Sequence, residues 1–393
     1  MKKQLALVLA GGGSLGSYEV GAIKALEELG YHFDIVTGTS IGALNGAFVY
    51  LHQTDRLESL WSNITPEKVM KNGTNFSKNY ILDNKDVIKN EYKNWLKVYV
   101  SNRNLGADIS PFKEYVANGI DLSKRKDSKI KFAVTCTQIP SMKKINVDMN
   151  NIAIDKFLPY LHASSACFPI FPIEVIDGEK YIDGFYNDNL PMKLAVDMGA
   201  TDIIAIDMRL FSLEPSDKFF IDLPNVSYIA PFHSLGSLVD FRQEIIRKNM
   251  QLGYWDTMKY FGKMHGFASN ITGEVPDIKI ISFLLERDQS ISKTVIENIK
   301  KGINRPMYEV DYFIRILEII AENLKIPMTY VSYTFNEFFA LIRKECIKQR
   351  KEAREGLTIK SIIKELGFER AMDSFLNDFI DAFIIKNKII VRK

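Results

Sequence analysis

Cysteine and histidine are scarce in this sequence, and their scarcity limits the chemistry that the chain can carry. Its 393 residues include 3 cysteines and 5 histidines. Cys136, Cys167 and Cys346 are widely spaced, so they predict neither a disulfide framework nor a paired metal-ligand motif. We interpret them as free thiols of a reducing compartment, and Cys167 as a small buried apolar residue.

Long apolar runs and a strong charge bias are also missing. No apolar run reaches the roughly 20 residues that a membrane-spanning helix needs. The apolar segment at residues 5–10 meets a glycine cluster at once, so it is too short for a secretion signal and predicts a first core strand. The formal net charge of +3 is too small to indicate a nucleic-acid partner. These features predict a cytoplasmic protein that binds no nucleic acid, and they carry no signal of oligomeric state.

What the sequence does contain is apolar material for a large α/β core. Apolar residues make up 46% of the chain, enough for more than one structural unit. Buried strands are predicted at residues 5–10, 131–137 and 202–207, with a further strand at 278–283. Because predicted helices alternate with these strands, we expect a parallel sheet that is covered on both faces.

The pentapeptide Gly38-Thr39-Ser40-Ile41-Gly42 has the pattern Gly-x-Ser-x-Gly, and it lies unusually early in the chain. An apolar stretch precedes it and residues 43–49 follow as a second apolar segment, which predicts a strand, a tight turn and a helix. This context is typical of a nucleophile elbow, in which Gly38 and Gly42 permit a strained turn and close packing. Ser40 is therefore our candidate nucleophile.

A glycine cluster at residues 11–16, Gly-Gly-Gly-Ser-Leu-Gly, follows the first predicted strand directly. Apolar residues at positions 20, 23, 26 and 29 then predict a helix that ends at Gly30. Backbone N–H groups of such a loop can bind an anion, including the oxyanion of an acyl-transfer intermediate. The cluster also matches the dinucleotide fingerprint, but residues 38–40 stand where the ribose-binding acidic residue belongs. Nucleotide binding is therefore the weaker alternative.

Two Asp-Gly pairs lie close together in the sequence. Asp177-Gly178 separates two short strand-like segments and predicts a two-residue hairpin turn. Asp183-Gly184 comes where the second of these strands ends, and a helix is expected after it, with Pro191 in its first turn and Asn189 or Leu190 near its cap. Because a carboxylate at a strand end can act as general base to a serine, Asp183 is the candidate base, with a second turn residue as the alternative.

Together these elements resemble one family, the patatin-like phospholipases. The resemblance rests on a Gly-Gly-Gly-x-x-Gly loop at residues 11–16, the serine elbow at 38–42 and a distant Asp-Gly pair at 183–184, in this order. An Ala-Ser-x-Ala segment at 163–166 before the aspartate is also similar. The resemblance covers roughly residues 4–210 and fades through 211–290.

The resemblance implies an α/β fold, the three-layer patatin-like fold with a mostly parallel central sheet, here followed by a helical C-terminal region. It implies a lipid acyl hydrolase of the phospholipase A or esterase type. Ser40 would be the nucleophile, Asp183 its partner, and Gly11, Gly12 and Gly13 the oxyanion-hole donors. Such an enzyme needs no metal and no cofactor, and its substrate is an acyl lipid or phospholipid.

Two positions depart from the family pattern. Many members carry Arg or Lys where this chain has Leu15, and a small residue where it has Phe185. We expect the loss of a charge beside the glycine loop to alter substrate preference, and the ring of Phe185 to narrow the site or reposition Asp183. A catalytically weak or silent lipid-binding protein of the same fold is the corresponding alternative.

A Ser-His-Asp triad on an α/β-hydrolase fold is a further alternative. His233 or His265 could complete it, because both follow Ser40 and Asp183 in the chain. Against this, that fold normally places several strands before the elbow, whereas only one strand is predicted before Phe33 here. The remaining histidines have no distinctive context; they are His32, His52 and His162.

The rest of the chain is readable only coarsely. Residues 55–128 predict helices with loops, either a cover over a lipid site or an ordinary helical layer. We divide the chain into an acyl hydrolase domain, 1–290, and a helical region, 291–393. In the latter, residues 343–354 carry six basic and two acidic residues. We interpret them as a solvated helix face, with peripheral contact to an anionic membrane surface as the alternative.

Overall fold

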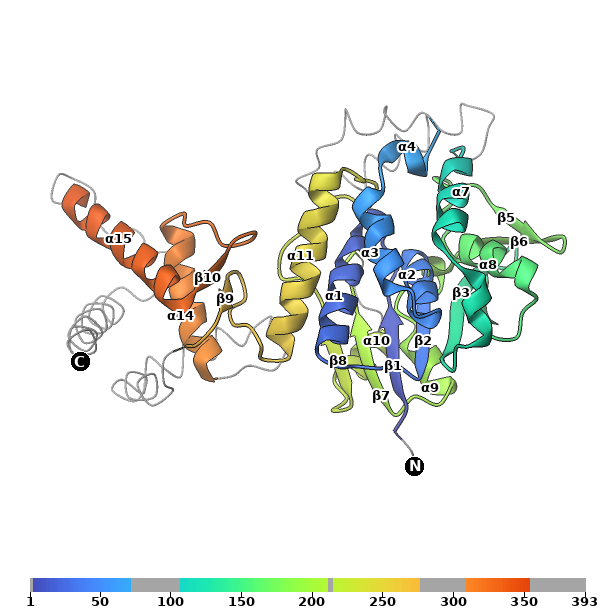
Figure 1. Ribbon diagram of the computed structural model, residues 1–393, viewed down its shortest axis with the longest axis horizontal. Helices are drawn as coiled ribbons and strands as arrows, with labels where there is room; N and C mark the ends of the chain where they lie inside the picture. The colour runs from blue at the N-terminus through green and yellow to red at the C-terminus, as the bar shows by residue number, and fades with distance from the viewer. Residues whose placement is uncertain (1–2, 72–106, 211–214, 276–308, 354–393) are drawn as a thin grey trace. The chain divides into compact units, whose positions relative to one another are not determined.

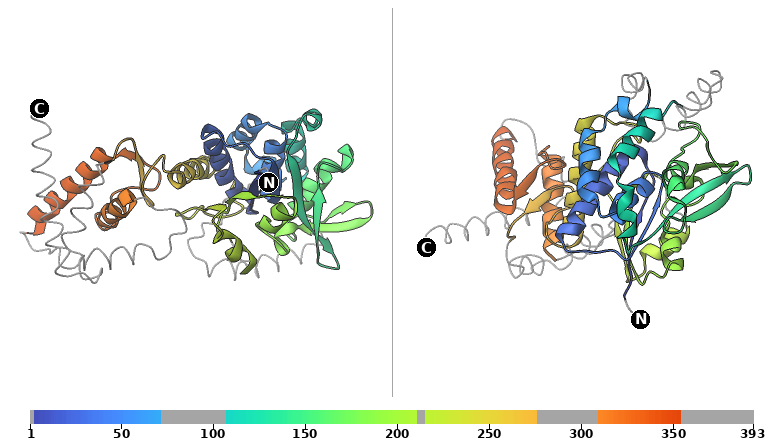
Figure 2. Two further views of the ribbon diagram at one scale, coloured as in Figure 1. Left: turned by 90° about the horizontal axis from the view of Figure 1, so that it is seen from below. Right: turned by 45° about the vertical axis from the view of Figure 1, so that its right-hand side comes forward.

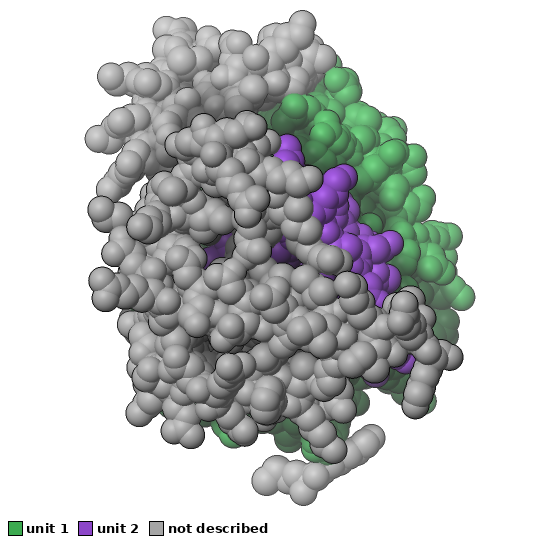
Figure 3. Space-filling view, turned by 90° about the vertical axis from the view of Figure 1, so that its left-hand side faces the viewer, with its two compact units in different colours: residues 1–258 green, residues 259–393 purple. Residues whose placement is uncertain are grey.

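A computed structural model describes residues 3–71, 107–210, 215–275 and 309–353 of the chain (Figure 1). The chain forms two compact units, residues 1–258 and residues 259–393 (Figure 3). The domain boundary predicted at residue 290 lies outside the described residues and stays a prediction. So does the strand predicted at 278–283.

An eight-stranded sheet forms the centre of the first unit. Its strands are β1 (Leu5–Leu9), β2 (Ile35–Thr39), β3 (Lys131–Ile139), β4 (Lys143–Asp148), β5 (Glu174–Ile176), β6 (Glu179–Asp183), β7 (Asp202–Ile206) and β8 (Val226–Ile229). The hydrogen-bonded order is β5-β6-β3-β2-β1-β7-β8, and β4 pairs with β3 beside this path. Five neighbouring strands of this order are parallel; they are β3, β2, β1, β7 and β8. The other three strands, β4, β5 and β6, pair in antiparallel fashion. The prediction of a mostly parallel central sheet is confirmed.

Helices cover both faces of this sheet. They are α1 (Ser17–Glu28), α2 (Ile41–Tyr50), α3 (Thr54–Asn63), α4 (Pro66–Val69), α7 (Ser110–Gly119), α8 (Phe157–Ser164), α9 (Met192–Asp197), α10 (Pro215–Ile221) and α11 (Gln243–Tyr260). Short 3-10 turns are η1 (Gly13–Gly16), η2 (Leu122–Lys126), η3 (Ile154–Lys156) and η4 (Gly184–Tyr186). In Figure 2, α1 and α2 lie on one side of the sheet, and α9 and α10 lie on the other. This arrangement follows from right-handed crossovers that proceed from β1 in opposite directions.

Burial accounts for the apolar sequences of β2 and α2, which lie in the core of the first unit. Every residue of β2 is buried, as expected for a parallel strand with helices on both faces. α2 is buried along its whole length. Its Tyr50 stacks on Phe132 of β3 with ring centroids 5.2 Å apart, and on Phe157 of α8 at 6.1 Å. These aromatic contacts fix the helix that follows Ser40 against the centre of the sheet.

Two local predictions around the second half of the sheet can be compared with the structure. The turn between β5 and β6 is confirmed, with Asp177 and Gly178 at φ values of 53° and 82°. The start of α9 differs by one position, because Pro191 is the N-cap residue and Met192 opens the helix. Leu190 lies directly before the cap, as predicted, whereas Pro191 is the cap itself and not a residue of the first turn. The backbone of Pro191 has ψ at 59°, outside the helical range.

The second unit is mainly helical in its described part. It contains β9 (Asn270–Thr272), α14 (Glu309–Asn323), β10 (Ser332–Thr334) and α15 (Phe335–Ala353), and its two strands pair in parallel. A core that includes Ile314, Leu317 and Phe338 joins the helices. Buried Glu318 accepts hydrogen bonds from the N–H groups of Phe267 at 2.7 Å and Ser269 at 2.8 Å. Across the described ranges, no helix is both long and apolar enough to pass through a membrane.

Two glycines bring the backbones of α1 and α11 into contact. A Cβ atom placed on Gly21 would lie 1.8 Å from the carbonyl oxygen of Met250. One placed on Gly253 would lie 1.8 Å from the carbonyl oxygen of Tyr18. Because both obstacles are backbone atoms, neither contact can be relieved by a side-chain rotation.

We expect Gly253→Ala to destabilise the fold by roughly 1–3 kcal/mol, because the added methyl forces the helices apart. Intrinsic helix propensity would give the opposite sign, since Ala is favoured over Gly by about 1 kcal/mol. Urea denaturation measures the difference. Gln251→Ala, at an exposed position of the same helix, is the matched control. A Gly253→Ala protein as stable as the wild type would contradict this account of the packing.

Candidate active site

The register of β3 brings two distant strand ends together. β4 pairs with residues 133–138 of β3 and therefore occupies one edge of that strand. β2 pairs with residues 131–135 and β6 with residues 136–139, so both must lie along the opposite edge. β2 runs parallel to β3 and β6 runs antiparallel to it, so their last residues meet where Thr135 is followed by Cys136. Ser40 and Asp183 lie at this junction.

Ser40 occupies a strained turn between β2 and α2. Its φ of 57° and ψ of −125° place it in a region that non-glycine residues rarely adopt. The turn needs Gly38 and Gly42, because a Cβ on Gly38 would lie 2.5 Å from the Gly42 carbonyl oxygen. A Cβ on Gly42 would lie 2.5 Å from the carbonyl oxygen of Leu9 in β1. Ser40 thus lies in a strained connection between a strand and a helix.

Asp183 faces Ser40 at hydrogen-bond distance. The Ser40 hydroxyl donates to Asp183 Oδ2 at 2.6 Å, and the Phe185 N–H donates to Oδ1 at 3.0 Å. Asp183 is fully buried and Ser40 is 7% exposed. Burial raises the pKa of Asp183 from 3.8 to about 7, although the hydrogen bonds from Ser40 and Phe185 act in the opposite direction. A carboxyl with this pKa can exchange a proton with the serine near neutral pH.

Ser164 holds the backbone of Ser40, a role that sequence reasoning missed. Its hydroxyl oxygen accepts the Ser40 N–H at 3.0 Å and donates to the carbonyl oxygen of Thr135 at 2.7 Å. Two residues later, the carbonyl oxygen of Ala166 accepts the Asp183 N–H at 2.9 Å. The Ala-Ser-x-Ala similarity was the available signal, but it did not say what the serine contacts. This segment ties the two strand ends to one helix terminus.

The glycine loop lies directly beside Ser40. A Cβ on Gly11 would be 2.9 Å from the Cβ of Ser40. The Gly11 N–H already donates to the carbonyl oxygen of Asn189 at 3.2 Å. Among the described residues, the N–H groups of Gly12 and Gly13 have no such backbone acceptor. Of the three predicted oxyanion donors, Gly11 is therefore the one already engaged.

A buried polar network, which was not predicted from the sequence, holds the C-terminal end of the glycine loop. The carboxylate of Glu19 accepts from the side-chain amide of Asn45 at 2.8 Å. The same amide donates to the carbonyl oxygen of Gly16 at 3.0 Å, and Trp61 donates to the Asn45 oxygen at 2.9 Å. Burial raises the pKa of Glu19 well above its usual value. The network links α1, α2 and α3 to the end of the glycine loop.

The two departures from the family pattern have clear positions. Leu15 is 3% exposed, so its side chain belongs to the core. The Phe185 ring stacks on Tyr186 with centroids 4.0 Å apart, and its N–H binds Asp183. Asp183 lies within hydrogen-bond distance of Ser40 with this ring in place.

The histidines of the alternative triad make other contacts. His265 belongs to the second unit, and its Nδ1 lies 3.3 Å from Asp311. The His233 ring packs edge-on against Phe232 with centroids 5.2 Å apart. Each carboxyl oxygen of Asp183 already accepts one hydrogen bond, Oδ2 from the Ser40 hydroxyl and Oδ1 from the Phe185 N–H.

Two thiols lie near this site. Cys136 is buried opposite Asp183 in the sheet, and Cys167 is partly buried. Burial, and secondarily the charge of Asp183, raises the pKa of both thiols well above its usual range. Neither is therefore a thiolate near neutral pH, which agrees with an apolar packing role.

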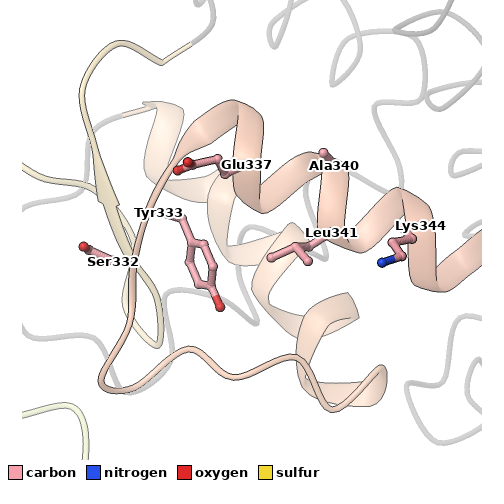
Figure 4. A pocket seen from close by; sticks show the side chains of 6 residues that line it. All are labelled: Ser332, Tyr333, Glu337, Ala340, Leu341 and Lys344. Atoms are coloured by element: carbon pink, nitrogen blue, oxygen red, sulfur yellow. The ribbon is translucent and has the colours of Figure 1, made fainter.

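A separate hollow of about 510 Å³ lies on the second unit (Figure 4). Its lining side chains come from β10 and α15, and they are Ser332, Tyr333, Glu337, Ala340, Leu341 and Lys344. Its acidic residue, Glu337, accepts from the N–H and hydroxyl of Thr334 at 2.8 Å each. Glu337 therefore serves as part of a capping box at the start of α15. The hollow offers no nucleophile–base pair comparable with Ser40 and Asp183.

Comparison with known proteins gives consistent matches over the N-terminal half. A family model described as Patatin-like phospholipase matches residues 7–196. Patatin-like phospholipase domain-containing protein 7 from Mus musculus is 31% identical over 207 residues, covering 52% of this chain and 13% of that protein. Lysophospholipase NTE1 from Mycosarcoma maydis is 27% identical over 217 residues, covering 52% of this chain and 10% of that protein. The chain thus spans only about a tenth of the length of these relatives.

Among solved structures, VipD from Legionella pneumophila aligns with a TM-score of 0.40 and 12% identity, covering 96% of this chain and 87% of that chain. The family match is the informative one, because residues 7–196 include the glycine loop, Ser40 and Asp183. Residues 7–196 therefore form a patatin-like phospholipase domain.

Proposed function

We propose that this protein is a serine lipid acyl hydrolase of the phospholipase A or esterase type, with Ser40 as nucleophile and Asp183 as general base. The observation that carries the proposal is the 2.6 Å hydrogen bond from the Ser40 hydroxyl to the buried Asp183 carboxyl. The strained turn at Ser40 supports it, because such strain is concentrated at functional sites. The family, and relatives that include a lysophospholipase, support a lipid ester as substrate.

The chemistry proceeds in two halves. Asp183 accepts the hydroxyl proton while Ser40 Oγ attacks the ester carbonyl carbon, and a tetrahedral intermediate forms. The intermediate collapses, the alcohol leaves with the proton from Asp183, and the acyl group remains on Ser40. Asp183 then takes a proton from water, which attacks the acyl-serine, and it returns this proton to Ser40 Oγ as the fatty acid leaves. Each step uses groups of the chain and water, so the scheme needs no metal or cofactor.

The glycine loop stabilises the oxyanion in this scheme. Gly12 and Gly13 are the preferred donors, because the Gly11 N–H already binds Asn189. An N–H group aimed at the developing charge contributes roughly 3 kcal/mol to lowering the barrier. Gly11 would contribute by allowing the loop to approach Ser40. We place the reaction at a membrane surface that the protein contacts peripherally, since acyl lipids reside there.

We expect a fluorophosphonate probe to label Ser40 covalently, and Ser40→Ala to abolish both labelling and esterase activity. Asp183→Asn keeps the shape but not the basicity, so it should lower kcat by roughly 10²–10⁴-fold. Mass spectrometry of the adduct and an acyl-ester assay check these outcomes. An intact protein without an adduct at Ser40 would favour a silent lipid-binding protein of the same fold.

Histidine variants distinguish the pair from a triad. We expect His233→Ala and His265→Ala each to keep kcat within about twofold of the wild type, because neither histidine binds Asp183. The same ester assay measures both. A loss as large as that of Asp183→Asn in either variant would contradict the proposed dyad.

The raised pKa of Asp183 predicts opposite effects of pH on activity and stability. Only the carboxylate can act as base, so kcat/KM should rise with pH through an apparent pKa of about 7 and then level off. The folded chain holds the Asp183 proton up to about pH 7, whereas the unfolded chain releases it near 3.8. Over that window the folded state binds more protons, so its stability falls as pH rises.

Asp183→Asn removes the loss of folding stability that accompanies ionisation of the buried carboxyl. Its free energy of unfolding should exceed that of the wild type by roughly 2–4 kcal/mol at about pH 8, and the difference should vanish at about pH 4. Chemical denaturation at both pH values measures it. An Asp183→Asn variant that is less stable than the wild type at the higher pH would contradict the assignment of a desolvated carboxylate.

Ser164 offers a test of positioning. We expect Ser164→Ala to lower kcat about tenfold with little change in KM, because the Ser40 N–H loses its partner and the strained turn relaxes. Ser165→Ala is the matched control, since the equally buried Ser165 hydroxyl binds only carbonyl oxygens of its own helix. The rate of fluorophosphonate labelling at Ser40 provides a second readout. If Ser164→Ala and Ser165→Ala lowered kcat and the labelling rate equally, Ser164 would have a purely structural role.

A further inference from the structure

The order of the parallel strands creates a topological switch point between β1 and β7, where α/β folds form a ligand-binding crevice. From β1 the chain passes through β2 to β3 on one side, whereas β7 and β8 extend the sheet on the other side. Where strand order reverses in this way, the loops leaving the two strands turn to opposite faces, and ligands bind outside their carboxyl ends. The glycine loop forms one wall of this crevice. Asp207, Met208 and Arg209, which follow β7, form the other.

Two close contacts connect the glycine loop to the segment after β7. The Ala10 N–H, just before the glycine loop, donates to the carbonyl oxygen of Ile206 at 3.2 Å. A Cβ on Gly12 would lie 2.7 Å from the terminal methyl of Met208. Arg209 is the next residue along the chain, so it lies beside the loop that flanks Ser40.

The backbone of Arg209 is held in an unfavourable conformation. Its φ is 51°, close to the 57° of Ser40, and the two residues follow the strands on either side of β1. The Arg209 N–H donates to Asp207 Oδ1 at 3.0 Å, and the Tyr228 hydroxyl donates to Asp207 Oδ2 at 2.5 Å. A buried carboxylate thus fixes the turn. Strain that is maintained in this way is typical of ligand-binding positions.

The charge of Arg209 is available at the surface of this edge. Its side chain is exposed, and no carboxylate of the described residues forms an ion pair with it. Lys144, which also lies near the end of β2, is already paired with Asp188 at 3.1 Å. Burial and the neighbouring Asp207 raise the pKa of Tyr228, and the Arg209 charge acts in the opposite direction on the pKa of both Tyr228 and Asp207, so the guanidinium lies close to this hydroxyl–carboxyl pair. Its five N–H donors leave several for a ligand.

We propose that Arg209 binds the phosphate of a phospholipid substrate and thereby makes the enzyme prefer phospholipids to neutral acylglycerols. The inference rests on the proposed function and adds a specificity residue to it. A guanidinium fork matches two phosphate oxygens, and the switch-point crevice places it across from the glycine loop. The ester carbonyl then lies toward Ser40 and the headgroup toward β7. Leu15 is buried, so the charge at this edge comes from a different strand end.

The test compares two substrates that differ only in the headgroup. Lysophosphatidylcholine and a monoacylglycerol with the same acyl chain are presented in neutral detergent micelles, and kcat/KM is measured for each. We expect Arg209→Met to lower the ratio of the two values by about 10- to 100-fold, the effect of losing a charged hydrogen-bonding pair. Arg209→Lys should restore part of the ratio, because it keeps the charge without the fork.

Two further variants separate charge from backbone strain and from surface charge in general. Arg209→Gly removes the guanidinium and tolerates the positive φ, so it should lower the ratio as much as Arg209→Met. Arg56→Met removes an exposed guanidinium from α3 of the same unit and should keep the ratio within about twofold. An unchanged ratio in Arg209→Met, or equal losses on both substrates in the Met and Gly variants, would overturn the proposal.

Competitors distinguish a lipid headgroup from free phosphate. Glycerophosphocholine should inhibit the wild type and lose potency in Arg209→Met, whereas inorganic phosphate should be a much weaker inhibitor. Equal inhibition by the two compounds would assign the position to free phosphate instead. If the wild type hydrolyses neither substrate and Ser40 is not labelled by fluorophosphonate, the proposed function fails first, and this inference fails with it.

Discussion

The site depends on one edge of β3. That edge pairs with β2 over its first half and with β6 over its second, and the two strands run toward each other. Ser40 and Asp183 are 143 residues apart in sequence, yet this pairing leaves them facing one another across a single step of β3. The hydrogen-bond ladder of a sheet permits little slippage where both faces are buried, so the distance between the two side chains is set by backbone pairing.

Around this junction, the fold maintains two unfavourable conditions at once. Ser40 has a strained backbone, and Asp183 is desolvated with no cationic partner among the residues that the structure describes. Both conditions are tolerated because neighbouring groups fix them: Ser164 holds the Ser40 N–H, and Phe185 holds the carboxyl. Desolvation is also what brings the pKa of Asp183 near neutrality. The physical cause of reduced stability is therefore the same as the cause of basicity.

The strands, the elbow and the hairpin turn could be predicted because each depends on a few consecutive residues. A Gly-x-Ser-x-Gly turn, an apolar run or an Asp-Gly pair carries its conformation locally. The contacts of Ser164, and the network of Glu19, Asn45 and Trp61, could not be predicted in this way, since they join helices through tertiary packing. Pro191 was predicted in the first turn of α9 and is instead its cap, because its ψ of 59° is not helical although its φ would suit a helix.

The same distinction applies to charge. Sequence comparison at position 15 indicates a missing cation, but position 15 points into the core, where its leucine packs well and an unpaired cation would be costly. An electrostatic requirement at a site is set by the position of the charge, and the chain segment that supplies it is free to vary. At a topological switch point, two loops from different strands line the same crevice, so either can provide the cation. Arg209 follows β7 at this switch point, a position that no alignment of the glycine loop alone would reveal.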